Sequence, residues 1–344
     1  MGTRRRFFVT LAIVLAVVLI AGVLAVTRPW QPRPTRIVVL SDSLSEGMGE
    51  VTALEKTWPH LLGSRLREYR REGESGGTWL PASLGGDMFE FEAGRPQRGA
   101  WPARDGVGVP GAVEGGSVSW DVGRFDTAVV HVYSERAGAS FTATSGDRRV
   151  EFSSPGAGLH SFEVGDLGTT LTVTGNGAIV GVLGRTGQGS IEVYNLSWSG
   201  SSTSDWLWWL DQPGLRSLLT TIDPDVVVLS LGGNDFWNDG DRDRFGAHLR
   251  AIHDRVGQAA PRASWILGTQ PVADETSETS WLDFQQVTLD YAAELGVPVI
   301  DLAHRMPVVK VAPQLYARDR IHLTDAGQAF VADLAESAFY EARP

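Results

Sequence analysis

The sequence predicts an α/β protein whose parallel sheet is interrupted by a β-rich insertion and preceded by an N-terminal apolar segment. Short apolar strands alternate with helical patterns near both ends of the chain, whereas helical periodicity is absent from the middle. Strands that alternate with helices are typical of a parallel sheet covered on both faces. The predicted division is as follows: 1–35, anchor or signal and linker; 36–75, first part of the α/β domain; 76–190, β-rich insertion; 191–344, second part of the α/β domain.

The N-terminal segment has the features of an export or anchor sequence. An apolar or neutral run from Phe7 to Val26 follows Arg4–Arg6 and is long enough for a helix of roughly 30 Å. Basic residues before such a helix predict that the rest of the chain lies outside the cytoplasm. The arginines also resemble a twin-arginine signal, so a cleaved signal peptide is the competing interpretation. The length of the run favours an uncleaved transmembrane anchor, and the proline-rich Thr27–Thr35 predicts a stiff spacer.

The first α/β part begins with a short buried strand over Arg36–Leu40. A helix is predicted from Glu50 to about Arg71, because Trp58 and Leu62 recur on one side of a 3.6-residue period.

Residues 76–190 are rich in glycine and contain short alternating runs such as "TAVVHVYS" and "TLTVTG". Short strands separated by frequent turns predict a β-sandwich of jelly-roll type. The segment lies between the strand that ends in Ser41–Ser43 and the strand that leads to Gly200. We therefore expect both ends of the segment to emerge beside these residues, and the segment to form one wall of a substrate site. Trp101, Trp120 and Tyr133 are candidates to stack on sugar rings there, the alternative being that they pack in the core.

The α/β pattern returns at Ile191, and Thr324 is the predicted N-cap of a closing helix. Strands and helices are predicted in this order: "SIEVYNL" strand, "SDWLWWLDQPGLRSLLTTI" mostly helix, "PDVVVLSLG" strand, Asp241–Val256 helix, "SWILGTQ" strand, Trp281–Leu295 helix, "VPVIDL" strand, Thr324–Ala342 helix.

Small polar residues follow the predicted strands of the α/β part. The first strand ends in Ser41-Asp42-Ser43, and later segments carry Ser197–Gly200, Gly232–Asp235 and Asp319–His322. Ligands of parallel sheets bind beyond the carboxyl ends of the strands. A nucleophile, an amide donor and an Asp/His pair are therefore predicted to meet at one edge.

These segments resemble the sequence blocks of the SGNH (GDSL-type) hydrolase superfamily. "SDSLSEG" resembles its first block, "NLSWSG" its second, "LGGND" its third and "DRIHLT" its fifth, in the family's order. The resemblance covers the interrupted α/β domain and implies a three-layer flavodoxin-like fold. It also implies a serine ester hydrolase that needs no cofactor.

The resemblance implies a role for each matching residue. Ser43 would be the nucleophile, His322 its general base, and Asp319 the carboxylate that orients the imidazole. The backbone N–H groups of Ser43 and Gly200 and the amide of Asn234 would form the oxyanion hole.

Several residues in and near these blocks have competing interpretations. Asp301 and His304 share the Asp-x-x-His spacing, but the loop context favours His322. We expect Asp42 and Asp235 to accept backbone N–H bonds that shape their loops.

The first block raises two further points. Ser41 to Ser43 alone would also suit an ordinary helix N-cap. Ser41 stands where the family usually has glycine, which relaxes the limits on the backbone.

The composition limits the partners of the protein. A formal net charge of −11 argues against binding to nucleic acid, and the scattered histidines suggest no metal site. Trp198 and Trp237 are predicted to contact the substrate, whereas Trp208 and Trp209 are expected in the core. The expected partner is an acylated glycan or small ester, besides the membrane that the N-terminal segment would contact.

Three functional hypotheses follow. The first is an acylesterase that removes O-acetyl groups from cell-envelope or other polysaccharides. The second is an O-acyltransferase with the same site, and the third is a non-catalytic carbohydrate-binding protein of the envelope.

Overall fold

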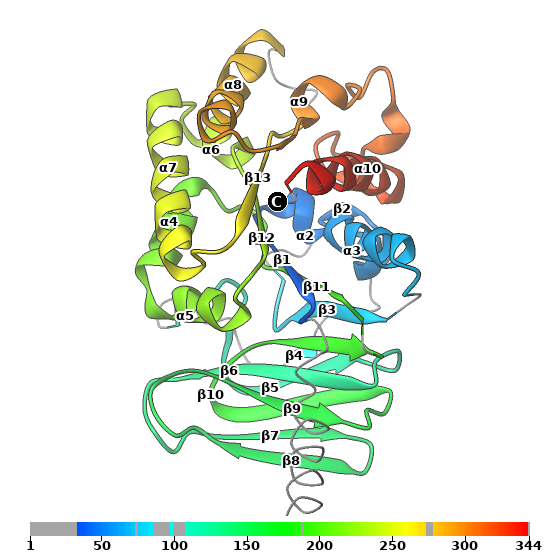
Figure 1. Ribbon diagram of the computed structural model, residues 1–344, viewed down its shortest axis with the longest axis vertical. Helices are drawn as coiled ribbons and strands as arrows, with labels where there is room; N and C mark the ends of the chain where they lie inside the picture. The colour runs from blue at the N-terminus through cyan, green and yellow to red at the C-terminus, as the bar shows by residue number, and fades with distance from the viewer. Residues whose placement is uncertain are drawn as a thin grey trace, which may run out of the picture. The chain divides into compact units, whose positions relative to one another are not determined.

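Parallel strands form the centre of the fold, in the order β14–β13–β12–β1–β11–β3 (Figure 1). The computed structural model describes residues 33–72, 75–84, 97–98, 107–187, 189–272 and 278–342. The predicted α/β fold with a mostly parallel sheet is confirmed. The parallel strands are β1 (Thr35–Ser41), β3 (Gly76–Pro81), β11 (Ile191–Asn195), β12 (Val226–Ser230), β13 (Ser264–Gly268) and β14 (Val299–Ile300).

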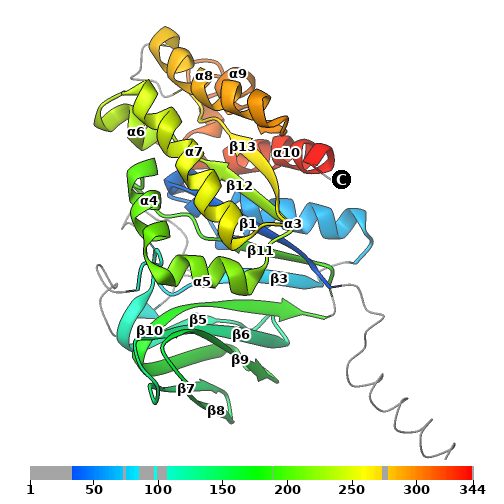
Figure 2. The same cartoon turned by 60° about the vertical axis from the view of Figure 1, so that its left-hand side comes forward.

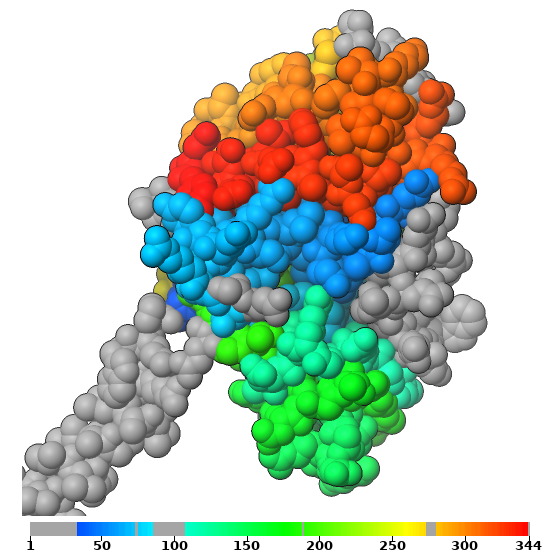
Figure 3. Space-filling view, turned by 90° about the vertical axis from the view of Figure 1, so that its right-hand side faces the viewer, coloured from blue at the N-terminus to red at the C-terminus, as the bar shows by residue number. Residues whose placement is uncertain are grey.

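Helices cover both faces of this parallel sheet because its strands are apolar on both sides. In β1, Ile37 and Val39 face one core, and Val38 and Leu40 face the other. The first core is covered by α3 (Trp58–Tyr69) and α10 (Asp325–Ala342), which lie side by side (Figure 3). The second is covered by α4 (Thr203–Asp211), α5 (Pro213–Ile222), α7 (Arg242–Ala259) and α8 (Glu278–Leu295), on the other side of the sheet (Figure 2).

The middle of the chain adds antiparallel strands to the same sheet. The longest, β10 (Thr170–Thr186), pairs with β3, β5, β6 and β7 along its length. Its neighbours enclose a core of their own that includes Trp120, Val130 and Phe141. Thr35–Pro344 forms one compact unit. The other strands of this part are β4 (Gln97–Arg98), β5 (Val113–Asp121), β6 (Thr127–Ser134), β7 (Ser140–Ser145), β8 (Arg148–Ser153) and β9 (Gly158–Gly165).

The ends of segment 76–190 lie at the edge of the sheet opposite to Ser43. Ile191, directly after the segment, pairs with Thr35 at the start of β1, and β3 begins beside the start of β11. The expectation that both ends emerge beside Ser43 is therefore wrong. The physical reason is that β11 runs parallel to β1 and must cross the sheet before the chain reaches Gly200.

Two predicted helices begin or end differently in the structure. The helix expected from residue 50 begins at Trp58, because Gly49–Glu50 (β2) pairs with Leu323–Thr324 (β15) and Leu54–Lys56 forms a short 3₁₀ helix (η1). The helix expected after residue 204 is divided into α4 and α5 at Pro213, whose ring cannot continue a helix.

The closing helix begins as predicted. Thr324 Oγ1 accepts a hydrogen bond from the N–H of Gly327 at 3.2 Å, so Thr324 caps α10.

The apolar run Phe7–Val26 lies outside the residues that the structure describes. Within the described residues, none of the helices combines the length and apolar character that crossing a membrane requires.

Candidate active site

The predicted site residues lie on short segments that follow or flank the central strands. Ser43 is the first residue of α2 (Ser43–Glu46), directly after β1. Gly200 lies in the loop after β11, and Asn234 lies in α6 (Gly233–Asn238), which follows β12. His322 directly precedes β15, which pairs with β2 just beyond α2.

The structure brings Ser43, His322 and Asp319 into one hydrogen-bonded series. Ser43 Oγ lies 2.9 Å from His322 Nε2, and His322 Nδ1 lies 2.6 Å from Asp319 Oδ2. With a proton on Nδ1, the imidazole donates to the carboxylate and presents Nε2 as an acceptor to the hydroxyl. This arrangement suits a serine activated by a neighbouring base.

The loop that carries Asp319 is shaped by its own carboxylate. Asp319 Oδ1 accepts the backbone N–H groups of Ile321 at 3.0 Å and His322 at 2.9 Å. Arg320, which lies between Asp319 and Ile321, has a φ of 64°. Burial raises the pKa of Asp319, but the bonds from His322 and these two N–H groups outweigh it and leave the pKa lowered. Asp319 therefore remains ionised beside the imidazole.

Gly49 supports the other side of His322. Its φ is +116°, and a Cβ added there would lie 2.8 Å from the Cβ of His322 and 2.9 Å from the carbonyl oxygen of Leu323. Only glycine combines this φ with so close an approach. Gly49 was not among the predicted site residues, although a glycine close after the first block was a visible signal.

The three predicted oxyanion donors lie on α2, in the loop after β11 and on α6. Asn234 donates one amide hydrogen to the carbonyl of Ser201 at 2.9 Å, which leaves its second N–H for another acceptor. The N–H of Ser43 is at the first position of α2, where no acceptor exists within the helix. Gly200 is exposed and has a φ of 77°.

Ser41 is accommodated without strain. It is the last residue of β1, its Oγ donates to the carbonyl of Ser230 at 2.6 Å, and it accepts from Ser45 Oγ at 2.7 Å. Ser45 Oγ in turn accepts from Trp58 Nε1 at 2.9 Å. Ser41 does not have the positive φ that would demand glycine, and its hydroxyl fixes the turn to the neighbouring strand.

Asp42 and Asp235 shape their loops as expected. Asp42 caps α2 by accepting the N–H of Leu44 at 3.1 Å, so the N-cap interpretation holds for Asp42 rather than for Ser43. Asp235 accepts the N–H of Thr203 at 3.1 Å. Burial raises the pKa of both carboxyls, that of Asp42 to about 7.

A cavity of about 160 Å³ opens beside Ser43 and His322. Trp237, 46% exposed, is at its rim, whereas Trp198 packs beside Gly111 and does not line it. None of its lining residues comes from the described part of 76–190, so no described residue of that segment forms the expected wall of the site. The lining residues are Asp42, Ser43, Leu44, Gly233, Asn234, Trp237, Gln270, Pro271, Trp281, Ile321 and His322.

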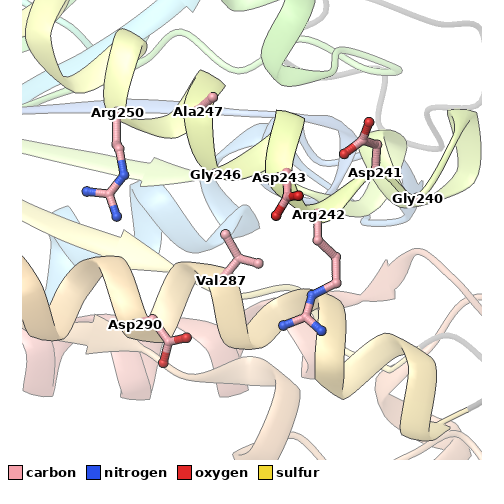
Figure 4. A pocket seen from close by; sticks show the side chains of 9 residues that line it. All are labelled: Gly240, Asp241, Arg242, Asp243, Gly246, Ala247, Arg250, Val287 and Asp290. Carbon is pink, nitrogen blue, oxygen red and sulfur yellow. The ribbon is translucent and has the colours of Figure 1, made fainter.

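A larger groove of about 770 Å³ lies between α7 and α8 (Figure 4). Charged side chains line it, among them Arg242, Asp243 and Asp290. Arg250, also in its wall, bonds Glu294 at 2.6 Å, which takes up part of its donor capacity. No predicted site residue lines this groove.

The competing Asp/His pair is separate from Ser43. His304 Nδ1 lies 3.1 Å from Asp301 Oδ1, and its side chain is exposed. It makes no hydrogen bond to Ser43 in the structure, whereas His322 does.

The aromatic predictions met different outcomes. Trp208 is 41% exposed rather than in the core, because it faces outward from α4, whereas the ring of Trp209 packs partly against the core. Trp120 and Tyr133 are buried, so the core alternative holds for both, and Trp101 lies outside the described residues.

Two residues that line the site were not predicted from the sequence, Gln270 and Trp281. Gln270 is buried and donates to the carbonyl of Ser230 at 3.2 Å, and Trp281 donates to the carbonyl of Gln270 at 3.3 Å. Both line the cavity. Trp281 reaches the site only through the packing of α8, which no local pattern predicts, whereas Gln270 follows the carboxyl end of β13, where a polar residue was a visible signal.

Metal ligands do not gather anywhere in the described part of the chain. No group of three or more His, Cys, Asp or Glu side chains there could hold a metal ion.

Comparison with known proteins adds a family match. The model of the GDSL-like lipase/acylhydrolase family matches residues 137–330, more than half of the chain. This range contains Gly200, Asn234, Asp319 and His322 and begins after Ser43. No curated protein matches the sequence.

One solved structure shares the fold at low sequence identity, and two others are similar to the chain at lower TM-scores. A peptidoglycan O-acetylesterase is 17% identical with a TM-score of 0.71, over 90% of this chain and 91% of that chain. An esterase, EstA from Pseudoalteromonas sp., is 13% identical with a TM-score of 0.46, over 89% of this chain and 97% of that chain. A family 3 carbohydrate esterase from Clostridium thermocellum is 13% identical with a TM-score of 0.43, over 90% of this chain and 96% of that chain.

Proposed function

Since this chain belongs to the GDSL-like lipase/acylhydrolase family, we propose that it is a serine acylesterase that removes O-acetyl groups from polysaccharides. The observation that carries the proposal is the hydrogen-bonded series from Ser43 through His322 to Asp319, at a cavity. Each member has the chemistry that ester hydrolysis requires.

The proposed reaction has two steps. His322 Nε2 takes the hydroxyl proton while Ser43 Oγ forms a bond to the ester carbonyl carbon. The resulting oxyanion is stabilised by the N–H groups of Ser43 and Gly200 and by the free amide hydrogen of Asn234. The alcohol leaves with the proton from His322, and water then hydrolyses the acyl-enzyme by the same route, which regenerates Ser43.

The cavity supports a short acyl group. Its volume of about 160 Å³ is below the roughly 300–1,000 Å³ of pockets that enclose drug-sized ligands. Trp281 and Pro271 are among its apolar lining residues, and Trp237, also in the lining, offers an aromatic face for a sugar ring. The fold shared with a peptidoglycan O-acetylesterase agrees with this substrate class.

We infer a location outside the cytoplasm from the residues before Thr27 alone. The proposed location does not depend on the geometry of the site, so it can be wrong while the proposed activity is right. A fractionation experiment with an antibody to the chain would test it, and recovery with the cytoplasmic proteins would contradict it.

The central test measures hydrolysis of aryl esters with two, four and eight acyl carbons by the full-length protein and by Ser43→Ala. We expect acetate to be the best substrate, and Ser43→Ala to lose at least about 10³-fold in kcat with an unchanged melting temperature. A sugar acceptor included in parallel assays would reveal acyl transfer. Preference for the eight-carbon ester would contradict the cavity argument, and activity within about tenfold in Ser43→Ala would exclude the serine mechanism.

A further inference from the structure

The N–H of Gly200 is the oxyanion donor least supported by its own surroundings. Gly200 is exposed, and a Cβ added there would meet nothing within 4 Å. Its φ of 77° also lies in the region that side chains rarely adopt. This N–H belongs to the peptide that joins Ser199 to Gly200, so its direction follows the backbone of Ser199.

Ser199 is held by a buried carboxylate from α2. Glu46 Oε2 accepts the backbone N–H of Ser199 at 2.6 Å and also accepts its hydroxyl. Glu46 is only 4% exposed, and hydrogen bonds in such surroundings are electrostatically stronger than in water. Ser43 and Glu46 belong to the same helical turn, so the carboxylate joins the loop to the turn that carries the nucleophile.

Further bonds hold the loop at other points. The N–H of Trp198 donates to the carbonyl of Ser41 at 3.1 Å, and Asn195 Nδ2 donates to the carbonyl of Ser45 at 2.7 Å. After Gly200, Ser201 donates its N–H to the carbonyl of Trp198 at 3.2 Å and its hydroxyl to the carbonyl of Ser41 at 3.3 Å. Among the bonds that precede Gly200, those to Glu46 are the nearest to it, so Glu46 positions the backbone of Ser199.

We propose that Glu46 is a positioning residue that aims the Gly200 N–H at the oxyanion formed on Ser43. The proposal rests on the proposed esterase function and deepens it. Misplacement of a catalytic group by about 1 Å can cost 10²-fold in rate. Because the oxyanion exists only after attack, the loss should fall on kcat and leave KM nearly unchanged.

The test compares three variants of the full-length protein on an aryl acetate. Glu46→Ala should lower kcat by about 10²-fold. Glu46→Gln, whose single Oε1 can still accept the N–H of Ser199, should lower it by about tenfold. Ser199→Ala removes only the hydroxyl bond and should stay within about threefold of wild type.

Glu192→Gln is the matched control for loss of a buried carboxylate. Glu192 is 3% exposed and bonds Arg36 and Arg185 at the start of β11, away from Ser43. We expect Glu192→Gln to lower the melting temperature without changing kcat. A purely structural role of Glu46 would give the same pattern for both residues.

Inhibition by methylboronic acid supplies a second readout, because its adduct with Ser43 places an oxygen in the oxyanion hole. Its inhibition constant should rise in parallel with the fall in kcat, while KM stays within about twofold. A wild-type kcat in folded Glu46→Ala would overturn the proposal; if that variant does not fold, a wild-type kcat in Glu46→Gln would do so. Absence of Ser43-dependent hydrolysis in the wild-type protein would instead contradict the proposed function itself.

Discussion

At the residue scale, the site depends on a contact between the two ends of the described chain. Ser43 and His322 are 279 positions apart in sequence, and their side chains are 2.9 Å apart. Asp301 and His304 share the spacing of Asp319 and His322 but lie apart from the serine. Sequence spacing alone therefore does not identify the base; the approach to Ser43 does.

The two histidines give a direct comparison. His322→Ala should lower kcat on an aryl acetate by at least about 10³-fold, because Ser43 loses the acceptor for its proton. His304→Ala should leave kcat within about twofold, because its partner is Asp301. Steady-state kinetics of both purified variants decide the assignment, and the opposite order would make His304 the base.

The raised pKa of Asp42 predicts how the stability of the folded protein depends on pH. Burial raises its pKa from the ordinary value of 3.8 to about 7 in the folded protein, so the folded state binds this proton more tightly than the unfolded state. The contribution of protonated Asp42 to the stability of the folded protein is fully present below pH 3.8 and is lost as the pH rises to about 7.

Asp42→Asn removes this titration and keeps an oxygen that can cap α2. The melting temperature of the variant relative to wild type should therefore increase between pH 4 and pH 8, as the native carboxyl ionises. Thermal unfolding at intervals across this range measures the difference. A constant difference between the two proteins would show that Asp42 does not titrate in this window.

At the element scale, the pairing of β2 with β15 holds the histidine loop beside α2. Gly49 in β2 is essential to this pairing, because any side chain there would meet His322 and the carbonyl of Leu323. The same pairing explains why the helix predicted from residue 50 begins only at Trp58. Element boundaries here are set by the active-site loop rather than by helical propensity.

Gly49→Ala should therefore impair catalysis as well as stability. We expect a fall in kcat of at least about tenfold, since small displacements of a catalytic base are costly. Gly138→Ala is the matched control, because Gly138 also has a positive φ of 82° but open space around it. Kinetics and melting temperatures should show destabilisation in both variants but a loss of kcat only in Gly49→Ala; an unchanged kcat there would contradict the packing argument.

At the scale of the whole molecule, the β-rich segment shares one hydrogen-bonded sheet with the parallel strands. Trp79, Tyr133 and Leu183, which lie on β3, β6 and β10, pack in the same core as the helices α5 and α7. Removing the segment would expose that core. We therefore expect residues 35–344 to unfold as one cooperative unit.

Phe141→Ala tests this expectation from the β-rich side, since Phe141 is buried in its separate core. Loss of the ring should destabilise by about 3–5 kcal/mol, and esterase activity should disappear at the same lowered temperature as the calorimetric signal. Leu249→Ala in α7 is the control from the helical side and should shift the same single transition. Two transitions, with activity surviving the first, would establish an independent domain.

The alternation of apolar strands with helices was sufficient to predict the α/β fold, because burial on both faces imposes that pattern locally. The polar residues at strand ends were sufficient to predict that Ser43 and Asn234 lie at one cavity, which His322 also lines. Parallel strands bring their carboxyl ends to one edge whatever the connections between them. These features depend on neighbouring residues and on sheet geometry, so a single sequence contains them.

The remaining features depend on contacts between distant segments and were decided by the tertiary structure. No local pattern predicts that Ser199 donates to Glu46 or that Gly49 approaches His322. Nor does one predict that Trp237, rather than Trp198, lines the cavity. The ends of 76–190 were placed at the wrong edge because the direction of β11 was not considered. Periodicity predicts which side of an element is buried, but which element covers that side is settled only when the whole chain packs.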